Sequence, residues 1–169
     1  SWKVTSTDYL AFQNLLKVSK NSKVAIIGGG GTARAAIGAL NTQVAAVDVL
    51  LRSESRMAAL VKAAPDLQVK KLDMTHALND YDLIVQTTPA GVFDEYVSNT
   101  AVAKGTLLEA LYKPSPTNLA RRYKELGGGV ITGKELLVEQ ALFQIQLFTG
   151  QEFDFEEMRK ALLSAIADD

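Results

Sequence analysis

The sequence contains no cysteine, which excludes disulfide bonds, thiolate zinc sites and cysteine nucleophiles. Redox chemistry would therefore require a bound cofactor. Histidine is nearly absent as well, because His76 is the only one and it lies in a polar stretch. A lone histidine without partners makes neither a catalytic triad nor a metal site, so we expect no metal in this protein.

Neither sign of charge is in excess, since 18 lysines and arginines stand against 19 aspartates and glutamates. Long-range charge therefore gives no reason to expect a nucleic acid or a membrane surface as a partner. Long hydrophobic runs are also lacking, because none approaches the roughly 20 residues that span a bilayer, and the amino terminus has no signal-peptide pattern. We expect a cytoplasmic protein whose partner is a small molecule.

What the sequence does contain is an alternation of apolar, β-branched runs with segments of helical periodicity. Five or six strands are expected, with candidates at residues 23–27, 44–51, 67–71, 82–86, 106–110 and 129–131. Six helices are expected, at residues 9–18, 32–40, 55–64, 118–126, 134–148 and 155–166. This alternation predicts an α/β fold with a doubly wound, mostly parallel, Rossmann-like sheet. The last two helices follow one another without a strand and form a C-terminal helical appendix.

A glycine-rich turn joins the first expected strand to the helix that follows it. Gly28, Gly30 and Ala33 form the pattern Gly-x-Gly-x-x-Ala, with Gly31 and Thr32 between them. In a dinucleotide site the first glycine permits the tight turn, the second lets the backbone approach a pyrophosphate, and the small third residue packs helix against strand. The alternative is a purely structural turn. The strand-turn-helix context favours dinucleotide binding.

The residues after the second expected strand bear on which dinucleotide is bound. Asp48 lies 20 residues after Gly28, the spacing of an acid that accepts from a ribose hydroxyl in NAD sites, but it is expected in the middle of the strand. Arg52 follows the strand, with Ser53 as the expected helix cap and Arg56 one turn later. Arginine matches the geometry and charge of a 2′-phosphate, so NADP is favoured over NAD. The alternative for both arginines is a solvated helix face.

Short motifs in a fixed order extend over nearly the whole chain. They are Ser6-Thr7-Asp8, the glycine turn, Arg52-Ser53-x-x-Arg56, Thr87-Thr88-Pro89-x-Gly91, Tyr112-x-Pro114 and Gly133-x-x-Leu136-Leu137-x-x-Gln140. In these motifs the chain resembles the carboxyl-terminal cofactor domain of shikimate dehydrogenases and the related quinate enzymes. It departs from that family at Leu51, where the family has asparagine, and at Lys134-Glu135-Leu136, where the family has Leu-Gly-Met beside the nicotinamide.

The resemblance implies the reversible reduction of 3-dehydroshikimate to shikimate by NADPH. It implies that Thr87, Thr88, Gly91, Gly133 and Leu136 belong to the cofactor site together with the glycine turn and the two arginines. The first three of these follow the fourth expected strand at its carboxyl end, where open α/β sheets bind ligands.

The resemblance also assigns residues to the substrate side. Asp8 matches an aspartate that acts with a lysine in proton transfer, and Gln140 and Tyr112 match residues that contact the substrate. From the residues alone, two alternatives stay open. Asp8 could be a simple helix cap, and Gln140 with Gln144 could contact another domain.

The family's substrate domain, with its catalytic lysine, precedes the matching stretch, and Lys3, Lys17, Lys20 and Lys23 do not have that lysine's context. We therefore expect residues 1–20 to be a linking helix and remnant of the substrate domain. Residues 21–132 are expected to form the dinucleotide-binding domain, and 133–169 the helices that pack back towards the substrate side.

Because the chain opens at Ser1, we expect an excised fragment or a processed product that binds cofactor but has little or no turnover. Two alternatives remain: an NAD-dependent quinate or shikimate dehydrogenase domain, and a non-enzymatic nucleotide-binding module. The helical surfaces that would dock a missing domain also suit a second subunit, so a homodimer stays open.

Overall fold

The computed structural model of the protein describes residues 5–167. Residues 1–4 and 168–169, which include Lys3 and the first part of the expected linking segment 1–20, lie outside the described residues.

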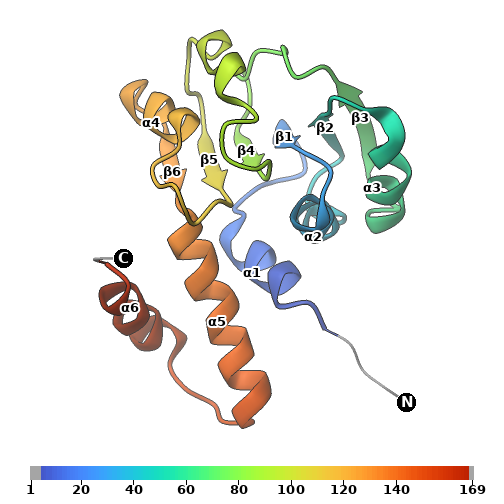
Figure 1. Cartoon of the computed structure of the whole chain (residues 1–169). Coiled ribbons are helices and arrows are strands. Elements are labelled where there is room, and N and C mark those ends of the chain that lie inside the picture. Colours follow the sequence, from blue (N-terminus) through green and yellow to red (C-terminus); the bar gives the residue numbers. More distant parts are fainter. Residues whose placement is uncertain (1–4, 168–169) are drawn as a thin grey trace.

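The centre of the molecule is a six-stranded sheet in which every neighbouring pair is parallel (Figure 1). Its strands are β1 (Val24–Ile27), β2 (Ala46–Leu50), β3 (Gln68–Leu72), β4 (Leu83–Gln86), β5 (Thr106–Glu109) and β6 (Gly129–Ile131). The order across the sheet is β3-β2-β1-β4-β5-β6, so the chain reverses its direction of winding between β1 and β4. This confirms the predicted doubly wound, Rossmann-like fold.

The six predicted helices are present, with altered ends. They are α1 (Thr7–Leu15), α2 (Gly31–Leu40), α3 (Met57–Ala63), α4 (Asn118–Glu125), α5 (Gly133–Thr149) and α6 (Phe155–Ala165). The described residues also form two short 3₁₀ helices, η1 (Glu54–Arg56) and η2 (Asp94–Asn99). The first helix was predicted at residues 9–18 but lies at Thr7–Leu15. It begins earlier because Ser6 caps it by accepting from the Tyr9 N–H, and it ends earlier because the chain is already extended at Leu16. The segment η2 was not predicted.

Successive residues of β1 point to opposite faces of the sheet, and each face is covered by its own hydrophobic layer. Val24 and Ile26 of β1 pack with α1, α2 and α3, and Leu136 of α5 belongs to the same cluster. Ala25 and Ile27 face the other layer, which contains Phe93 and the buried residues of α4. Because α1 and α5 share a core with the sheet, the segments that flank the dinucleotide-binding region pack directly on it.

The carboxyl-terminal helices extend the molecule to one side of the sheet. Thr132 and Glu135 form a capping box that starts α5, and Gly150 ends it in the left-handed conformation at φ 66°. Figure 1 shows α5 running away from the sheet, with α6 folding back alongside it. Within residues 5–167 no helix is both long enough and apolar enough to cross a membrane.

Candidate cofactor-binding site

A cleft of about 580 Å³ opens at the carboxyl ends of β1, β2 and β4, beside the point where the winding reverses. It is lined by Gly28, Gly29, Gly30, Gly31, Thr32, Leu50, Leu51, Arg52, Ser53, Ser55, Arg56, Met74, Thr87, Thr88, Pro89 and Val92. The fold thus brings the predicted glycine turn, both arginines and the two threonines to one site. The lining contains two arginines and no carboxylate, which suits an anionic ligand.

The first glycine of the turn is required by the backbone and by its neighbours. Gly28 has φ 108°, and a Cβ there would lie 2.6 Å from Thr87 Oγ1 and 3.1 Å from Thr88 Cγ2. The next position is also crowded, because a Cβ at Gly29 would lie 2.8 Å from Arg56 Cβ. At these two positions glycine lets neighbouring loops approach the turn.

The second motif glycine has free space in front of it. A Cβ at Gly30 would meet no atom within 4 Å, and Gly30 is the residue that precedes α2. Gly31 and Thr32 of the first turn of α2 line the cleft, and this turn contains no acidic residue that would compete with an anion for its free N–H groups. Ala33 is fully buried and packs α2 on the sheet, as the motif predicts. The open cradle fits a phosphate group.

The two predicted arginines are exposed and available to a ligand. Arg52 follows β2, and Ser53 Oγ caps η1 by accepting from the Ser55 N–H at 3.3 Å, which confirms Ser53 as a cap. Of the ion pairs found between residues 5 and 167, none involves Arg52 or Arg56. Arg34 on α2 was not predicted, yet its Nη2 lies 3.9 Å from the position of a Cβ at Gly31. Its place in the first helical turn after the glycines could have indicated that it lies near the glycine turn.

Asp48, the alternative ribose ligand, lies elsewhere. It is in the middle of β2, paired with Ala25, and it is absent from the lining of the glycine cleft. Its Oδ2 accepts a hydrogen bond from the Tyr81 hydroxyl at 2.7 Å. Burial, together with this hydrogen bond, raises the pKa of Tyr81. The geometry therefore gives Asp48 a structural partner in place of a nucleotide.

Buried and partly buried polar side chains hold the loop that follows β4. Thr87 Oγ1 donates to the Ile27 carbonyl at 2.7 Å, which ties this loop to the end of β1. Gln86 is 4% exposed, and its Oε1 accepts from the Thr88 N–H at 3.0 Å and from the Thr88 hydroxyl at 3.1 Å. Gly91 follows at φ 80°, exposed at the turn beyond Pro89. These contacts fix the predicted threonines at the edge of the cleft.

A second cleft of about 300 Å³ continues past the same threonines towards β5. It is lined by Thr32, Thr87, Thr88, Pro89, Ala110 and Leu111. Glu109 at the end of β5 is 3% exposed, and burial raises its pKa to about 7. Sequence reasoning missed Glu109, although a carboxylate inside an apolar run was a usable signal.

Three predicted residues, Tyr112, Gly133 and Leu136, do not line this second cleft. Tyr112 is partly buried and directly follows Leu111. Gly133 is buried where a Cβ would overlap the carbonyl oxygen of Leu111, and Leu136 is 3% exposed within the core. Neither Gly133 nor Leu136 lines either cleft, so their part in cofactor binding stays a prediction.

The predicted substrate-side residues lie on two packed helices, α1 and α5. Asp8 is in the first turn of α1, but the helix is capped by Ser6, so Asp8 is not the capping residue. Gln140 is on α5, whose Gln144 Nε2 donates to Thr7 Oγ1 at 3.3 Å. The structure brings the two helices together and does not test the roles of Asp8, Gln140 and Tyr112.

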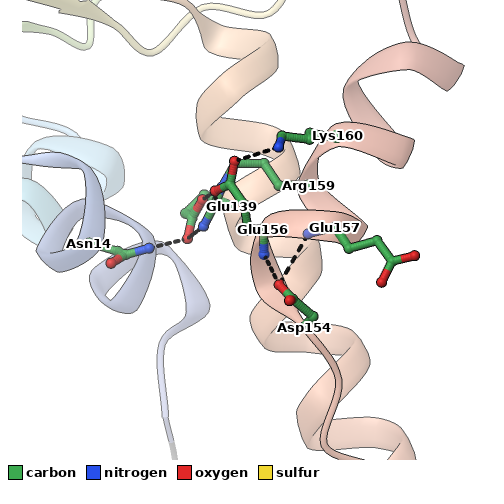
Figure 2. A network of polar contacts seen from close by, with 7 residues as sticks. All are labelled: Asn14, Glu139, Asp154, Glu156, Glu157, Arg159 and Lys160. Carbon is green, nitrogen blue, oxygen red and sulfur yellow. Dashed lines mark hydrogen bonds and ion pairs between the residues drawn. The ribbon is translucent and has the colours of Figure 1, made fainter.

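A buried network joins these helices to α6 (Figure 2). The Glu139 side chain is 1% exposed, and it accepts from Asn14 Nδ2 on α1. On the other side, Arg159 of α6 donates to it from Nε at 2.9 Å and from Nη2 at 3.2 Å. This ion pair raises the pKa of Arg159 further above its ordinary value. Within residues 5–167 no group of three or more histidine, aspartate or glutamate side chains is placed to hold a metal.

Known proteins match this chain throughout its length. The family model described as shikimate / quinate 5-dehydrogenase matches residues 10–106, and the model described as shikimate 5'-dehydrogenase C-terminal domain matches residues 133–163. A shikimate dehydrogenase of Sulfurisphaera tokodaii is 30% identical over 156 residues, which cover 90% of this chain and 58% of that protein. A shikimate dehydrogenase (NADP(+)) of Synechococcus sp. is 32% identical over 181 residues, which cover 98% of this chain and 62% of that protein.

The solved structures agree. The crystal structure of Mycobacterium tuberculosis shikimate dehydrogenase superimposes with a TM-score of 0.82 at 29% identity, covering 95% of this chain and 62% of that one. The chain therefore spans about three fifths of the length of these relatives. The matched residues 10–106 and 133–163 include the glycine turn, both arginines and the start of α5, and on this evidence the chain belongs to the shikimate / quinate 5-dehydrogenase family.

Proposed function

We propose that this chain is the NADP-binding part of a shikimate dehydrogenase that reversibly reduces 3-dehydroshikimate to shikimate with NADPH. The observation that carries the proposal is the glycine cleft, in which two arginines without ion-pair partners among residues 5–167 face a lining free of carboxylates. The relatives whose names include NADP(+) support the same cofactor.

The residues of the cleft divide between the two charged parts of this cofactor. Arg52 and Arg56, with the Ser53 hydroxyl between them, would hold the 2′-phosphate of NADP. The turn from Gly28 to Thr32 and the amino end of α2 would hold the pyrophosphate. Bound there, the cofactor supplies the hydride that the reaction transfers. Thr87, Thr88 and Gly91 would then contact its nicotinamide half, with Gly133 and Leu136 behind the pocket.

On the substrate side, we assign proton transfer to Asp8 and substrate contact to Gln140 and Tyr112. The position of Asp8 on α1, beside the helix that carries Gln140, supports this assignment. The lysines near Asp8 in the sequence, which are Lys3, Lys17, Lys20 and Lys23, do not have the sequence context of the family's catalytic lysine. The proposal therefore requires that the substrate domain of the family provide it, in a cytoplasmic enzyme.

The first test measures binding by calorimetry with NADP⁺ and with NAD⁺. We expect tighter binding of NADP⁺. Replacing Arg52 with alanine should remove roughly 1.5–3 kcal/mol of NADP⁺ binding free energy and leave NAD⁺ binding nearly unchanged, because only NADP⁺ carries the 2′-phosphate. Arg121→Ala, which removes an exposed arginine from α4, is the matched control and should bind both ligands normally. Preference for NAD⁺, or equal loss in both variants, would contradict the 2′-phosphate assignment.

A second test asks whether the chain turns over by itself. We expect the purified chain to bind NADP⁺ but to form no measurable NADPH when shikimate is added, because the proton-transfer pair is incomplete. The shikimate dehydrogenase of Mycobacterium tuberculosis serves as the positive control in the same absorbance assay. Steady NADPH production by this chain would show that its own residues complete the site.

A further inference from the structure

The carboxyl group of Glu109 lies between the two ends of the loop that forms the wall of the second cleft. Its Oε1 accepts from the Leu111 N–H at 3.2 Å, and its Oε2 accepts from the Thr117 hydroxyl at 2.7 Å. Thr117 in turn accepts from the Ala120 N–H at 3.1 Å as the cap of α4. One buried side chain therefore fixes both the start and the end of the segment 110–117.

This segment carries groups that face the ligand side of the molecule. Ala110 and Leu111 line the second cleft, and Tyr112 comes next in the chain. On its other side the Leu111 carbonyl is packed against Gly133, where even a methyl group would overlap it. Leu111 is thus held through its N–H by Glu109 and through its carbonyl by close contact with α5.

The neighbouring strand β4 also ends in a buried side chain that holds the loop after it. Gln86 is the register partner of Glu109, and it too accepts from the N–H two residues further along, at Thr88. Thr88 and Leu111 both line the second cleft, so two adjacent buried side chains shape its two walls. An arrangement repeated on adjacent strands indicates that the loop positions, and not only the stability of the sheet, depend on these groups.

We propose that Glu109 is a positioning residue that sets the Leu111 wall of the second cleft for the nicotinamide half of the cofactor. The proposal rests on the NADP assignment above, because a dinucleotide whose adenosine phosphate lies at Arg52 and whose pyrophosphate lies at the glycine turn extends towards Thr87 and Leu111. Glu109 itself lines neither cleft and acts through its hydrogen bond to Leu111.

The experiment compares two probes on three variants by calorimetry. NADP⁺ reaches both clefts, whereas adenosine 2′,5′-bisphosphate reaches only the first. In Glu109→Ala we expect NADP⁺ binding to weaken about tenfold and binding of the bisphosphate to change less than about twofold, because only the second cleft loses its wall. Glu109→Gln should restore NADP⁺ binding, since its amide oxygen accepts from Leu111 and its amide nitrogen donates to Thr117. Glu125→Ala, at an exposed glutamate of α4, is the control.

Two binding results would overturn the proposal. One is unchanged NADP⁺ binding by Glu109→Ala, and the other is equal weakening of both probes, which would signal a general loss of structure. Amide hydrogen exchange at Leu111 provides a readout that needs no ligand. We expect Leu111 to exchange faster in Glu109→Ala than in Glu109→Gln, and equal rates would overturn the positioning role. If the unaltered chain binds neither probe, the NADP assignment fails, and the exchange rates alone decide whether Glu109 positions the loop.

Discussion

Two glycines of one turn, Gly28 and Gly30, differ in what a side chain would meet. At Gly28 alanine would have to adopt φ 108° and would press on Thr87 and Thr88. We expect Gly28→Ala to lower the free energy of unfolding by about 1–3 kcal/mol, since strain at a positive φ adds to the overlap. Urea unfolding followed by circular dichroism measures this change.

For Gly30 we expect the opposite, a small effect of alanine on stability and a large effect on binding. Its surroundings are empty within 4 Å, so Gly30→Ala should change the free energy of unfolding by less than about 1 kcal/mol. NADP⁺ binding should nevertheless fall at least about tenfold, because the added methyl group occupies the space proposed for the pyrophosphate. A stable Gly30→Ala protein that binds NADP⁺ normally would show that the cradle is a structural turn.

At the scale of single elements, the end of β5 makes stability depend on pH. Burial raises the pKa of Glu109 from 4.5 to about 7, so the folded state binds this proton more tightly than the unfolded chain does. The stability that Glu109 contributes is therefore complete below pH 4.5 and is lost as the pH rises to about 7. Lys124 of α4 is the other charged side chain lining the small cavity beside Glu109.

Glu109→Gln isolates this titration. The unfolding free energy of the variant minus that of the unaltered chain should rise by about 2–3 kcal/mol from pH 5 to pH 8, because the amide of the variant never ionises. Urea unfolding at the two pH values measures the difference, and Glu125→Gln, which alters an exposed carboxylate, should show no such trend. If this difference in unfolding free energy is the same at both pH values, the pKa of Glu109 is not raised.

One of the contacts between α5 and α6 is an ion pair to a buried charge. Arg159→Met leaves the Glu139 carboxylate, which is 1% exposed, without its cation, and we expect it to cost about 2–4 kcal/mol of unfolding free energy. The double variant Glu139→Gln with Arg159→Met should be more stable than Arg159→Met alone, since it removes the unpaired charge. Urea unfolding of both variants tests this, and a double variant less stable than the single one would contradict it.

The elements themselves were largely predictable, and the exceptions have local causes. Apolar runs such as Val24–Ile27 and Leu83–Gln86 are buried on both faces, which is the pattern of central parallel strands. The missed η2 lies in a polar segment where buried Phe93 anchors the chain without helical periodicity. The early start of α1 depends on the hydroxyl of Ser6, which periodicity does not detect.

At the scale of the whole molecule, the cleft was predictable wherever its residues lie in one continuous motif. The glycine turn and Arg52-Ser53-x-x-Arg56 each occupy a few positions, and the rule that ligands bind at the carboxyl ends of strands brings them together. Met74 and Val92 enter the same cleft from loops whose course depends on packing. Glu109 was missed because its importance comes from burial, which a local pattern does not show. Glu139 was missed because it is buried and its partner Asn14 lies far along the chain.

The strand order also has a consequence for how the chain folds. β1 obtains its second neighbour, β4, only after a long excursion, as the bond between Lys23 and Asp82 spans 59 residues. Closing so long a loop precedes completion of the sheet centre and slows folding compared with local pairing. During synthesis β1 must therefore wait with one edge unpaired until β4 has emerged. A chain interrupted after β3 would keep that apolar edge open and would be prone to join strands with other molecules.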